Sequence, residues 1–472
     1  MRVAVVGGGI SGLTAAYRLR RELGPDAAII VCEASGVLGG KLRTVPLAGR
    51  PCDVGAEAFL ARRPEAVDLV RELGLGDALN HPAPVSATVR AGGRTLPLPK
   101  RTVMGVPAAA DAVAGVLSPD GSRAVAAEET LPGLTLPDAD LSLGALLRER
   151  FGDELVDRLV DPLLGGVYAG GADGLGLRAT LPALAAAVDA GARSLTAAAA
   201  AQLPANPSTA PVFGTLTGGL GDLIERLVRE SRAEIRLGVP VRAIGRRPGG
   251  GWRLTLGAAA AAHAPAEPDL DADAVVLAVP APAASRLLTG LAPEAAAAYG
   301  EVELASMAVI ALALPADTEL PQESGILIGE RERRRDGRPF AAKAFTFSSR
   351  KWPHHAVPGE PVFVRGSVGR FGDPRFLRAT DDELLRLVRD DLAELTGITA
   401  EPVDAVVQRW GGGLPQYGVG HTDRVARIER AIAELPGLEI AGAALHGVGI
   451  PACIATADAA ARRVAGLRVV GR

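Results

Sequence analysis

The sequence predicts an α/β protein built from more than one packed unit. Residues 1–35 follow a strand–turn–helix–strand pattern, the chain has 472 residues, and 48 % of them are apolar against 22 % charged. This length exceeds one ordinary hydrophobic core, and the composition is typical of a globular protein. The net charge of −3 argues against sequence-independent binding of nucleic acid, which needs a surplus of Lys and Arg.

The opening pattern carries a glycine motif between its first strand and its helix. Val3–Val6 is a short apolar run, Ser11–Leu23 has apolar residues at helical spacing, and Ala28–Cys32 is a second apolar run. A turn with the G-x-G-x-x-G spacing in this context predicts a dinucleotide site. The residues concerned are Gly7, Gly8, Gly9, Ile10, Ser11 and Gly12.

Each glycine of the motif has a physical role in such a site. Gly7 permits the tight turn, Gly9 lets a diphosphate approach the backbone, and Gly12 lets the helix pack on the strand. The free N–H groups at the start of the helix would then bind the diphosphate. A glycine-rich turn without a ligand is the alternative interpretation.

An acidic residue follows where the adenosine ribose would lie. Glu33 ends the second strand, 21 residues after Gly12. A carboxylate there accepts hydrogen bonds from the ribose and repels a 2′-phosphate, which disfavours NADP. The predicted site includes the next residue, Ala34.

Two further features favour FAD over NAD. Gly39, Gly40 and Lys41 follow the second strand, where a long dinucleotide would meet the backbone again. Near the other end of the chain, Gly442 and the run Gly447–Pro451 lead into a final helix, expected over residues 452–465. A helix N-terminus directed at the flavin pyrimidine would stabilise negative charge on the reduced ring.

The remaining segments predict three kinds of domain. Residues 65–79 predict a further helix, and an FAD-binding domain is expected to combine residues 1–84, 206–289 and 425–472. Residues 85–205 predict a mostly helical inserted domain. Residues 290–424 predict an α+β substrate domain, in which 381–395 is helical.

The sequence gives little sign of a metal, a disulfide or a membrane span. The cysteines and the histidines show no metal-ligand spacing, which favours a reducing cytoplasm and structural or solvated histidines. No signal peptide is expected before the first strand, and the hydrophobic stretch 181–202 contains Asp189 and Arg193. Contact with a membrane surface is the most that we expect.

Several motifs together resemble those of a known family. Gly7–Gly12 and Gly39–Lys41 are joined by five longer motifs: residues 55–60 (GAEAFL), 161–170 (DPLLGGVYAG), 351–354 (KWPH), 414–417 (LPQY) and 447–451 (GVGIP). Over nearly its whole length the chain resembles the flavin-dependent coproporphyrinogen III oxidases, within the protoporphyrinogen oxidase branch of the amine-oxidase-like flavoproteins. The resemblance implies a Rossmann-like FAD-binding domain of the amine-oxidase/glutathione-reductase type, an α+β substrate domain and a helical domain.

The resemblance also implies which residues contact FAD. Besides the first glycine turn, Glu33 and Lys41, it implies contacts from Gly55, Ala56, Glu57 and Ala58, and from the C-terminal residues Val448, Gly449 and Ile450. By match it adds Val241 on a middle strand and Trp410 before the LPQY motif. A core aromatic residue is the alternative interpretation of Trp410.

For the chemistry, the resemblance implies a six-electron oxidation of a porphyrinogen. Hydride passes from a meso carbon to flavin N5, and O2 reoxidises the flavin to give H2O2, so no protein side chain is predicted to be catalytic. Arg63 matches a substrate-contacting lysine, and Tyr168 is predicted to line the substrate cavity. A solvated arginine and a buried tyrosine with a satisfied hydroxyl are the alternatives.

The preferred substrate is predicted to be coproporphyrinogen III. Ala87 stands where the protoporphyrinogen enzymes carry a propionate-binding arginine, and a substrate with four propionates requires a more basic site. Protoporphyrinogen IX oxidase is the alternative within the branch. An amine oxidase, a phytoene desaturase, or a non-catalytic escort with the same fold are the alternatives outside it.

Overall fold

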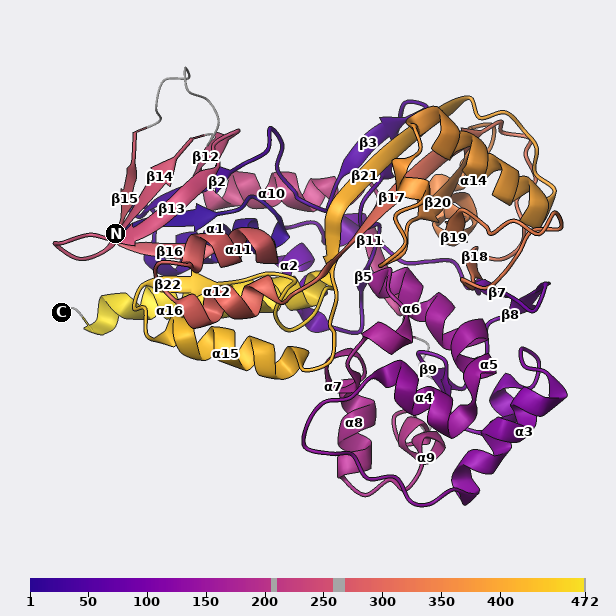
Figure 1. Ribbon diagram of the computed structural model, residues 1–472. Coiled ribbons are helices and arrows are strands. Elements are labelled where there is room, and N and C mark those ends of the chain that lie inside the picture. The colour runs from indigo at the N-terminus through magenta and orange to yellow at the C-terminus, as the bar shows by residue number, and fades with distance from the viewer. Residues whose placement is uncertain (205–209, 258–267, 471–472) are drawn as a thin grey trace.

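A five-stranded parallel sheet organises the first part of the molecule. The computed structural model describes residues 1–204, 210–257 and 268–470. The sheet has the order β12-β2-β1-β16-β22 and so combines segments that lie far apart in the sequence (Figure 1). Strand β1 lies at its centre, in keeping with its continuous apolar run. The strands are β1 (Arg2–Val6), β2 (Ala28–Glu33), β12 (Glu234–Leu237), β16 (Ala274–Leu277) and β22 (Leu438–Ile440).

Helices cover one face of this sheet. The first helix and the last helix of the chain, α1 and α16, pack together there, and α10 and α2 lie beside them. The two ends of the chain therefore meet, as expected for a cofactor held from both ends. The helices are α1 (Ile10–Leu23), α2 (Pro64–Glu72), α10 (Gly221–Ser231) and α16 (Ile450–Val470).

The other face of the sheet carries a small antiparallel sheet and three helices. Strands β13, β14 and β15 form the sheet, and its apolar side packs against Ile30 and Cys32 of β2. Residues 258–267, between β14 and β15, lie outside the described part of the chain. The elements are β13 (Val241–Arg246), β14 (Trp252–Leu256), β15 (Leu270–Ala272), α11 (Ala281–Leu288), α12 (Pro293–Gly300) and α15 (His421–Ala433).

A seven-stranded mixed sheet forms the second large part. Its order is β21-β17-β20-β19-β18-β7-β8, and α14 packs on one face of it. Helix α14 begins at a capping box in which Thr380 and Glu383 satisfy each other's backbone N–H groups. The elements are β17 (Leu304–Leu314), β18 (Gly325–Ile328), β19 (Ala342–Thr346), α13 (Ser348–Lys351), β20 (Val362–Val368), α14 (Asp381–Thr396) and β21 (Asp404–Pro415).

The first residues of the predicted helical segment are strands of this mixed sheet. Strands β7 (Thr88–Ala91) and β8 (Arg94–Pro97) form a hairpin that adds to β18. The turn residues Gly92 and Gly93 both have positive φ, at 57° and 75°, which is the two-residue turn that suits a hairpin. The expectation of a mostly helical segment from residue 85 onwards was wrong for these residues, because strands this short show no clear period.

Apart from a short hairpin of β9 (Thr102–Val103) and β10 (Val106–Pro107), the rest of that segment is mostly helical and has its own core. Residues such as Phe151, Leu155 and Leu159 are buried between its helices. No helix in the described residues is long and apolar enough to span a membrane. The α-helices of more than three residues are α3 (Pro119–Ala127), α4 (Leu143–Phe151), α6 (Asp161–Tyr168), α7 (Leu177–Thr180), α8 (Pro182–Asp189) and α9 (Leu195–Ala200).

Short elements connect these parts. Strand β11 pairs with both β5 and β6, and β3 pairs with β4. The helix expected over residues 65–79 is shorter than predicted, since α2 ends at Glu72, just before Gly74 with φ of 71°. The proposed division into domains stays a prediction. The strands are β3 (Thr44–Leu47), β4 (Arg50–Asp53), β5 (Phe59–Leu60), β6 (Leu79–Asn80) and β11 (Phe213–Leu216).

Candidate functional site

The glycine turn between β1 and α1 is tightly packed at two of its glycines. A Cβ at Gly7 would overlap the carbonyl oxygen of Ala278, and φ at Gly7 is +108°. A Cβ at Gly12 would overlap the carbonyl oxygen of Gly7. Packing within the protein therefore requires glycine at both positions, as the motif predicts for the turn and for helix–strand contact.

Gly9 is different, because the protein itself does not require a glycine there. Its φ is −80°, and the nearest atom to an added Cβ is the Cα of Gly40, at 3.9 Å. Gly9 is also the residue before α1, where backbone N–H groups are left without helical partners. A glycine with free space at a helix N-terminus fits a diphosphate that must approach the backbone.

Glu33 is fixed beside this turn at the end of β2. Its two carboxylate oxygens accept hydrogen bonds from the N–H of Gly8 and the N–H of Ser35, each at 2.7 Å. Glu33 is half-buried, and the neighbouring Ala34 is exposed. These bonds hold a negative charge next to the turn, where the ribose was predicted to lie.

The second glycine pair lies against the first turn. The N–H of Gly39 donates to the carbonyl of Gly8 at 2.9 Å, which brings Gly40 next to Gly9. Lys41 follows, and its pKa is lowered because burial disfavours the ammonium ion, an effect that the nearby Cys453 partly offsets. A bound anion beside Lys41 would favour the charged form, as a diphosphate site needs.

The start of α16 completes this group. The thiol of Cys453 is hydrogen-bonded to Ser11, and burial raises its pKa. Ile450 begins the helix and is buried in the core around β1, whereas Val448 packs against the core of the helical part. Gly449, between them, is exposed. The predicted C-terminal turn therefore lies where these two parts meet.

The Gly55–Ala58 segment is anchored to Lys41 through the backbone. The N–H of Ala56 donates to the carbonyl of Lys41 at 2.9 Å, and a Cβ at Gly55 would overlap that same carbonyl oxygen. Ala58 is partly exposed beside it. The structure thus brings this segment to the second glycine pair, and its contact with FAD stays a prediction.

The side chain of Glu57 has two cationic partners from the second large part of the molecule. Its carboxylate accepts a hydrogen bond from Nζ of Lys351 at 2.6 Å and pairs with Arg365, which also donates to the carbonyl of Gly55 at 2.7 Å. Burial would raise the pKa of Glu57, but the charges of Lys351 and Arg365 outweigh it and lower the pKa to about 2. Because its carboxylate is already paired, any contact between Glu57 and the cofactor would come from its backbone.

Two further predicted residues lie near these segments. Trp410 on β21 donates from Nε1 to the carbonyl of Val54 at 2.9 Å, and its ring lies next to Gly55. Val241 is buried at the start of β13, two residues after Val239, whose N–H donates to the carbonyl of Glu33 at 3.0 Å. Trp410 thus lies toward the second glycine pair and Val241 toward the ribose position.

Arg43 is a further candidate that the sequence motifs did not indicate. It follows Lys41 by two residues, and its carbonyl accepts a hydrogen bond from the N–H of Val54 at 2.9 Å. The Nε of its guanidinium is buried and has no hydrogen-bond partner among the described residues. A buried donor without a partner fits a site that a polar ligand completes. Its place just after the glycine pair was the available signal.

The predicted substrate residues lie in separate places. Tyr168 is buried at the end of α6, with its ring centroid 5.7 Å from that of Tyr417, and burial raises its pKa. Arg63 is exposed just before α2 and pairs with Glu65, which raises the pKa of Arg63. The described contacts of each residue do not include the other.

Arg63 lies near an apolar edge. Leu60 and Phe213, paired across β5 and β11, have 42 % and 39 % of their surface exposed. The Nζ of Lys351 lies 5.6 Å from the ring centroid of Phe213. Exposed apolar side chains bordered by cations suit a flat ligand that carries carboxylates.

Comparisons with known proteins agree with this geometry. The family model described as flavin containing amine oxidoreductase matches residues 10–465. The chain belongs to this family. It is a flavin oxidoreductase, and the predicted fold class is confirmed.

Individual relatives of this flavin oxidoreductase are similar over almost all of their length. A protein of Mycobacterium leprae (strain TN) named coproporphyrinogen III oxidase is 45 % identical, over 97 % of this chain and 96 % of that protein. The protein of that name from Bacillus subtilis (strain 168) is 32 % identical over the same shares. A solved structure from Exiguobacterium sp. 255-15, assigned as a protoporphyrinogen oxidase, has a TM-score of 0.84 and 33 % identity, and the match covers 99 % of each chain.

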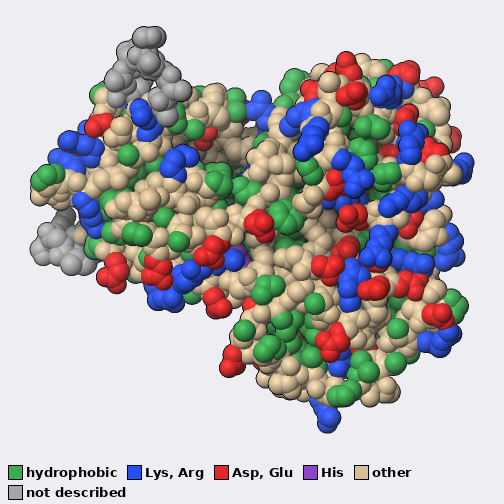
Figure 2. All heavy atoms as spheres, viewed as in Figure 1, with side chains coloured by type: hydrophobic (Ala, Val, Ile, Leu, Met, Phe, Trp, Pro, Cys, Tyr) green, Lys and Arg blue, Asp and Glu red, His purple; other side chains and the backbone are tan. Residues whose placement is uncertain are grey.

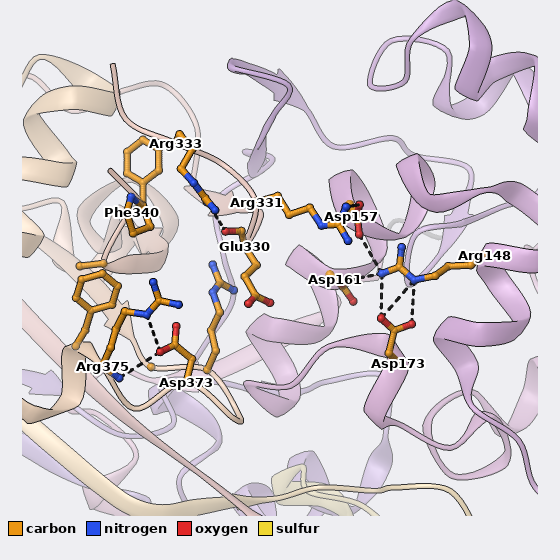
Figure 3. A pocket seen from close by; sticks show the side chains of 15 residues that line it. Arg148, Asp157, Asp161, Asp173, Glu330, Arg331, Arg333, Phe340, Asp373 and Arg375 are labelled. Carbon is orange, nitrogen blue, oxygen red and sulfur yellow. Dashed lines mark hydrogen bonds and ion pairs between the residues drawn. The ribbon is translucent and has the colours of Figure 1, made fainter. Parts of the chain in front are cut away.

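A charged cavity of about 230 Å³ lies elsewhere, between the helical part and the mixed sheet (Figure 3). Arg148 binds Asp157 and Asp173 at one side of it, and Arg375 pairs with Asp373 at the other. Acidic and basic side chains are intermixed over this part of the surface of the flavin oxidoreductase (Figure 2). Because these charges largely pair with one another, we assign no ligand to this cavity.

The adjacent histidines His354 and His355 are held by contacts within the protein. Their rings lie 4.2 Å apart, and His354 bonds through Nδ1 to the amide of Asn80 at 3.0 Å. Burial lowers the pKa of His354 to about 4 and that of His355 to about 3, so both are neutral near pH 7. The described residues contain no cluster of potential metal ligands, and the three cysteines are free and buried.

Proposed function

We propose that the protein is an FAD-dependent oxidase that converts coproporphyrinogen III to coproporphyrin III in haem biosynthesis, with O2 as the acceptor and H2O2 as the second product. The observation that carries this is the 45 % identity, over 97 % of the chain, to a protein named coproporphyrinogen III oxidase. The free, buried cysteines agree with a cytoplasmic location.

The choice of FAD rests on a set of groups around the two glycine turns that suit successive parts of a dinucleotide. Gly9 leaves room for a diphosphate, Glu33 lies at the ribose position, and Lys41 and Arg43 offer cationic groups at the second glycine pair. The start of α16 adds a contact from the other end of the chain. FAD, when bound, supplies the two-electron oxidation chemistry.

The protein's own residues hold and orient the substrate. Leu60 and Phe213 offer apolar surface to a flat tetrapyrrole, and Arg63 offers a guanidinium that pairs with a propionate in two-pronged geometry. The Glu57 ion pairs join the cofactor segment to the mixed sheet, so that the two parts keep a fixed spacing. Orientation of this kind is the main contribution a protein makes when a cofactor carries the chemistry.

Oxidation of protoporphyrinogen IX is the second candidate. The Exiguobacterium structure is assigned to that activity at 33 % identity. Against it, Ala87 offers no charge just before β7, where the protoporphyrinogen enzymes are expected to carry an arginine. The four-propionate substrate is therefore our first choice.

Steady-state kinetics with both porphyrinogens test the proposal. The purified yellow protein should oxidise coproporphyrinogen III with a higher kcat/KM than protoporphyrinogen IX, consume O2 and release H2O2. Cofactor released by heat should have the mass of FAD. A higher kcat/KM for protoporphyrinogen IX would overturn the substrate claim, and a protein without flavin would overturn the enzyme claim.

A further inference from the structure

The loop between β21 and α15 contacts all three parts of the molecule. We name residues 416–421 the junction loop, which runs from Gln416 to His421, the first residue of α15. The N–H of Gln416 donates to the carbonyl of Glu303 beside the mixed sheet at 2.8 Å, and the carbonyl of Tyr417 accepts from Gly176 in the helical part at 2.8 Å. Figure 1 shows α15, which follows the loop, close to α7. The loop also contacts the C-terminal turn before Gly449 and α16, which is predicted to contact the flavin.

The side chain of Gln416 holds the C-terminal end of α6, which carries the predicted substrate residue Tyr168. We call α6 the substrate helix. Its Nε2 donates to the carbonyl of Tyr168 at 2.7 Å, and the side chain is buried. Ala169 ends the helix in the left-handed conformation, with φ of 55°. A Cβ at Gly170 would overlap Oε1 of Gln416, so that the chain passes directly against this amide. The amide therefore fixes where Tyr168 lies.

The side chain of Tyr417 holds the C-terminal turn. Its hydroxyl donates to the carbonyl of Ala443 at 2.7 Å and accepts a hydrogen bond from the backbone of Gly447. It thereby ties together two points of the turn that precedes Gly449 and α16. Since the side chain of Tyr417 is buried, loss of its hydroxyl would leave two backbone groups without this partner.

His421 holds the ring of Tyr417 in place. Its ring stacks on that of Tyr417 with centroids 3.8 Å apart, and its Nε2 donates to the carbonyl of Leu445 at 3.0 Å. A carbonyl only accepts hydrogen bonds, so Nε2 carries the proton of the ring. Three bonds from two aromatic side chains of the loop therefore define the turn around residues 443–447.

We propose that Gln416 and Tyr417 are positioning residues that set the spacing between the porphyrinogen and the flavin. Gln416 fixes the substrate helix, Tyr417 fixes the flavin turn, and the peptide bond between them joins the two. This inference rests on the proposed function, because it assigns α6 to the substrate and the turn to the flavin. A small misplacement of reacting groups can cost orders of magnitude in rate, so the loop controls kcat without touching the reacting atoms.

Three variants test this: Tyr417→Phe, which keeps the stacked ring and removes the hydroxyl, Gln416→Met, which keeps the length and removes the amide, and the double variant. Each single variant, assayed well below its Tm, should lower kcat for coproporphyrinogen III by roughly tenfold while FAD content stays near wild type. Tyr417→Phe should also shift the visible flavin spectrum and the flavin reduction potential. The double variant should be no slower than the slower single variant, because both break one connection.

Tyr299→Phe is the matched control, since Tyr299 is also buried but belongs to α12 and the core on the other face of the parallel sheet. It should leave kcat and the flavin spectrum unchanged. Wild-type kcat in both single variants, or losses that only follow FAD content, would overturn the inference. Inactive wild type would instead overturn the proposed function, and the flavin spectrum and potential of Tyr417→Phe would still decide the role of Tyr417 at the turn.

Discussion

Glu33 and Glu57 were both assigned to the cofactor, yet their surroundings differ. Glu33 accepts hydrogen bonds from two backbone N–H groups beside the glycine turn. Glu57 is half-buried between Lys351 and Arg365, two cations from the second large part of the molecule. The first carboxylate lies beside the predicted ligand, and the second joins two parts of the protein. The comparison shows that nearness to a cofactor segment does not by itself give a side chain a binding role.

Among the residues predicted to contact the cofactor, substitution of Gly9 should have the largest effect on FAD binding. Gly9→Val should abolish FAD retention, because its branched side chain fills the space that the diphosphate needs. Gly9→Ala should weaken binding without strain, since its Cβ meets nothing closer than 3.9 Å. Absorbance of the flavin band after desalting measures retention.

Gly36→Val is the control, because an added Cβ at the exposed Gly36 also has free space around it. It should keep its FAD. A folded Gly9→Val protein that stays yellow would refute the diphosphate assignment.

Glu57→Gln should have the largest effect on stability. It leaves Lys351 and Arg365 largely buried without their counter-ion, which costs about 3–5 kcal/mol of unfolding free energy. Chemical denaturation measures the loss. Glu65→Gln, which breaks the exposed pair with Arg63, is the matched control and should change stability by no more than about 0.5 kcal/mol. Equal losses in the two variants would contradict the structural role of Glu57.

The pH dependence of the free energy of unfolding provides a second test of the Glu57 ion pairs. The pKa of Glu57 in the folded state is about 2, below its ordinary value of 4.5. The unfolded chain therefore takes up the proton first, so the stabilisation is present above pH 4.5 and is lost as the pH falls from 4.5 towards 2. Wild type should lose more stability over this interval than Glu57→Gln, and parallel curves would contradict the assigned pKa.

Glu33→Ala should act on the ligand more than on the fold. It removes one or two charge-assisted hydrogen bonds to the ribose, each worth ~1.5–3 kcal/mol of binding free energy. Titration of the apoprotein with FAD measures the change in Kd. Glu22→Ala, which removes an exposed charge of α1, is the control. Unchanged FAD affinity in Glu33→Ala would place the ribose contact elsewhere.

Arg63→Ala should have the smallest effect. Solvent screens the exposed guanidinium, so its pairing with a propionate is worth only ~1 kcal/mol, or about fivefold in KM for coproporphyrinogen III. The flavin spectrum should not change. Arg62→Ala, at the exposed neighbouring position, is the control. Identical KM values in Arg63→Ala and wild type would remove Arg63 from the substrate site.

The sequence was most informative where a structure depends on neighbouring residues. The strands and helix around Gly7–Gly12 lie within a few residues of each other, and β1, α1 and β2 have nearly the predicted bounds. The partners of Glu57 could not be predicted, because Lys351 lies 294 residues away and no local pattern links the two. The contacts of Gln416 and Tyr417 likewise form only once α6 and the C-terminal turn are folded against the junction loop.

Anaerobic reduction of the bound flavin tests the central claim most directly. The purified protein is mixed with coproporphyrinogen III in the absence of O2, and the visible flavin band is followed in a stopped-flow instrument. We expect the band to bleach at least as fast as the steady-state turnover, faster than with protoporphyrinogen IX, and to return when O2 is admitted. A flavin band that stays unchanged with both porphyrinogens would contradict the assignment.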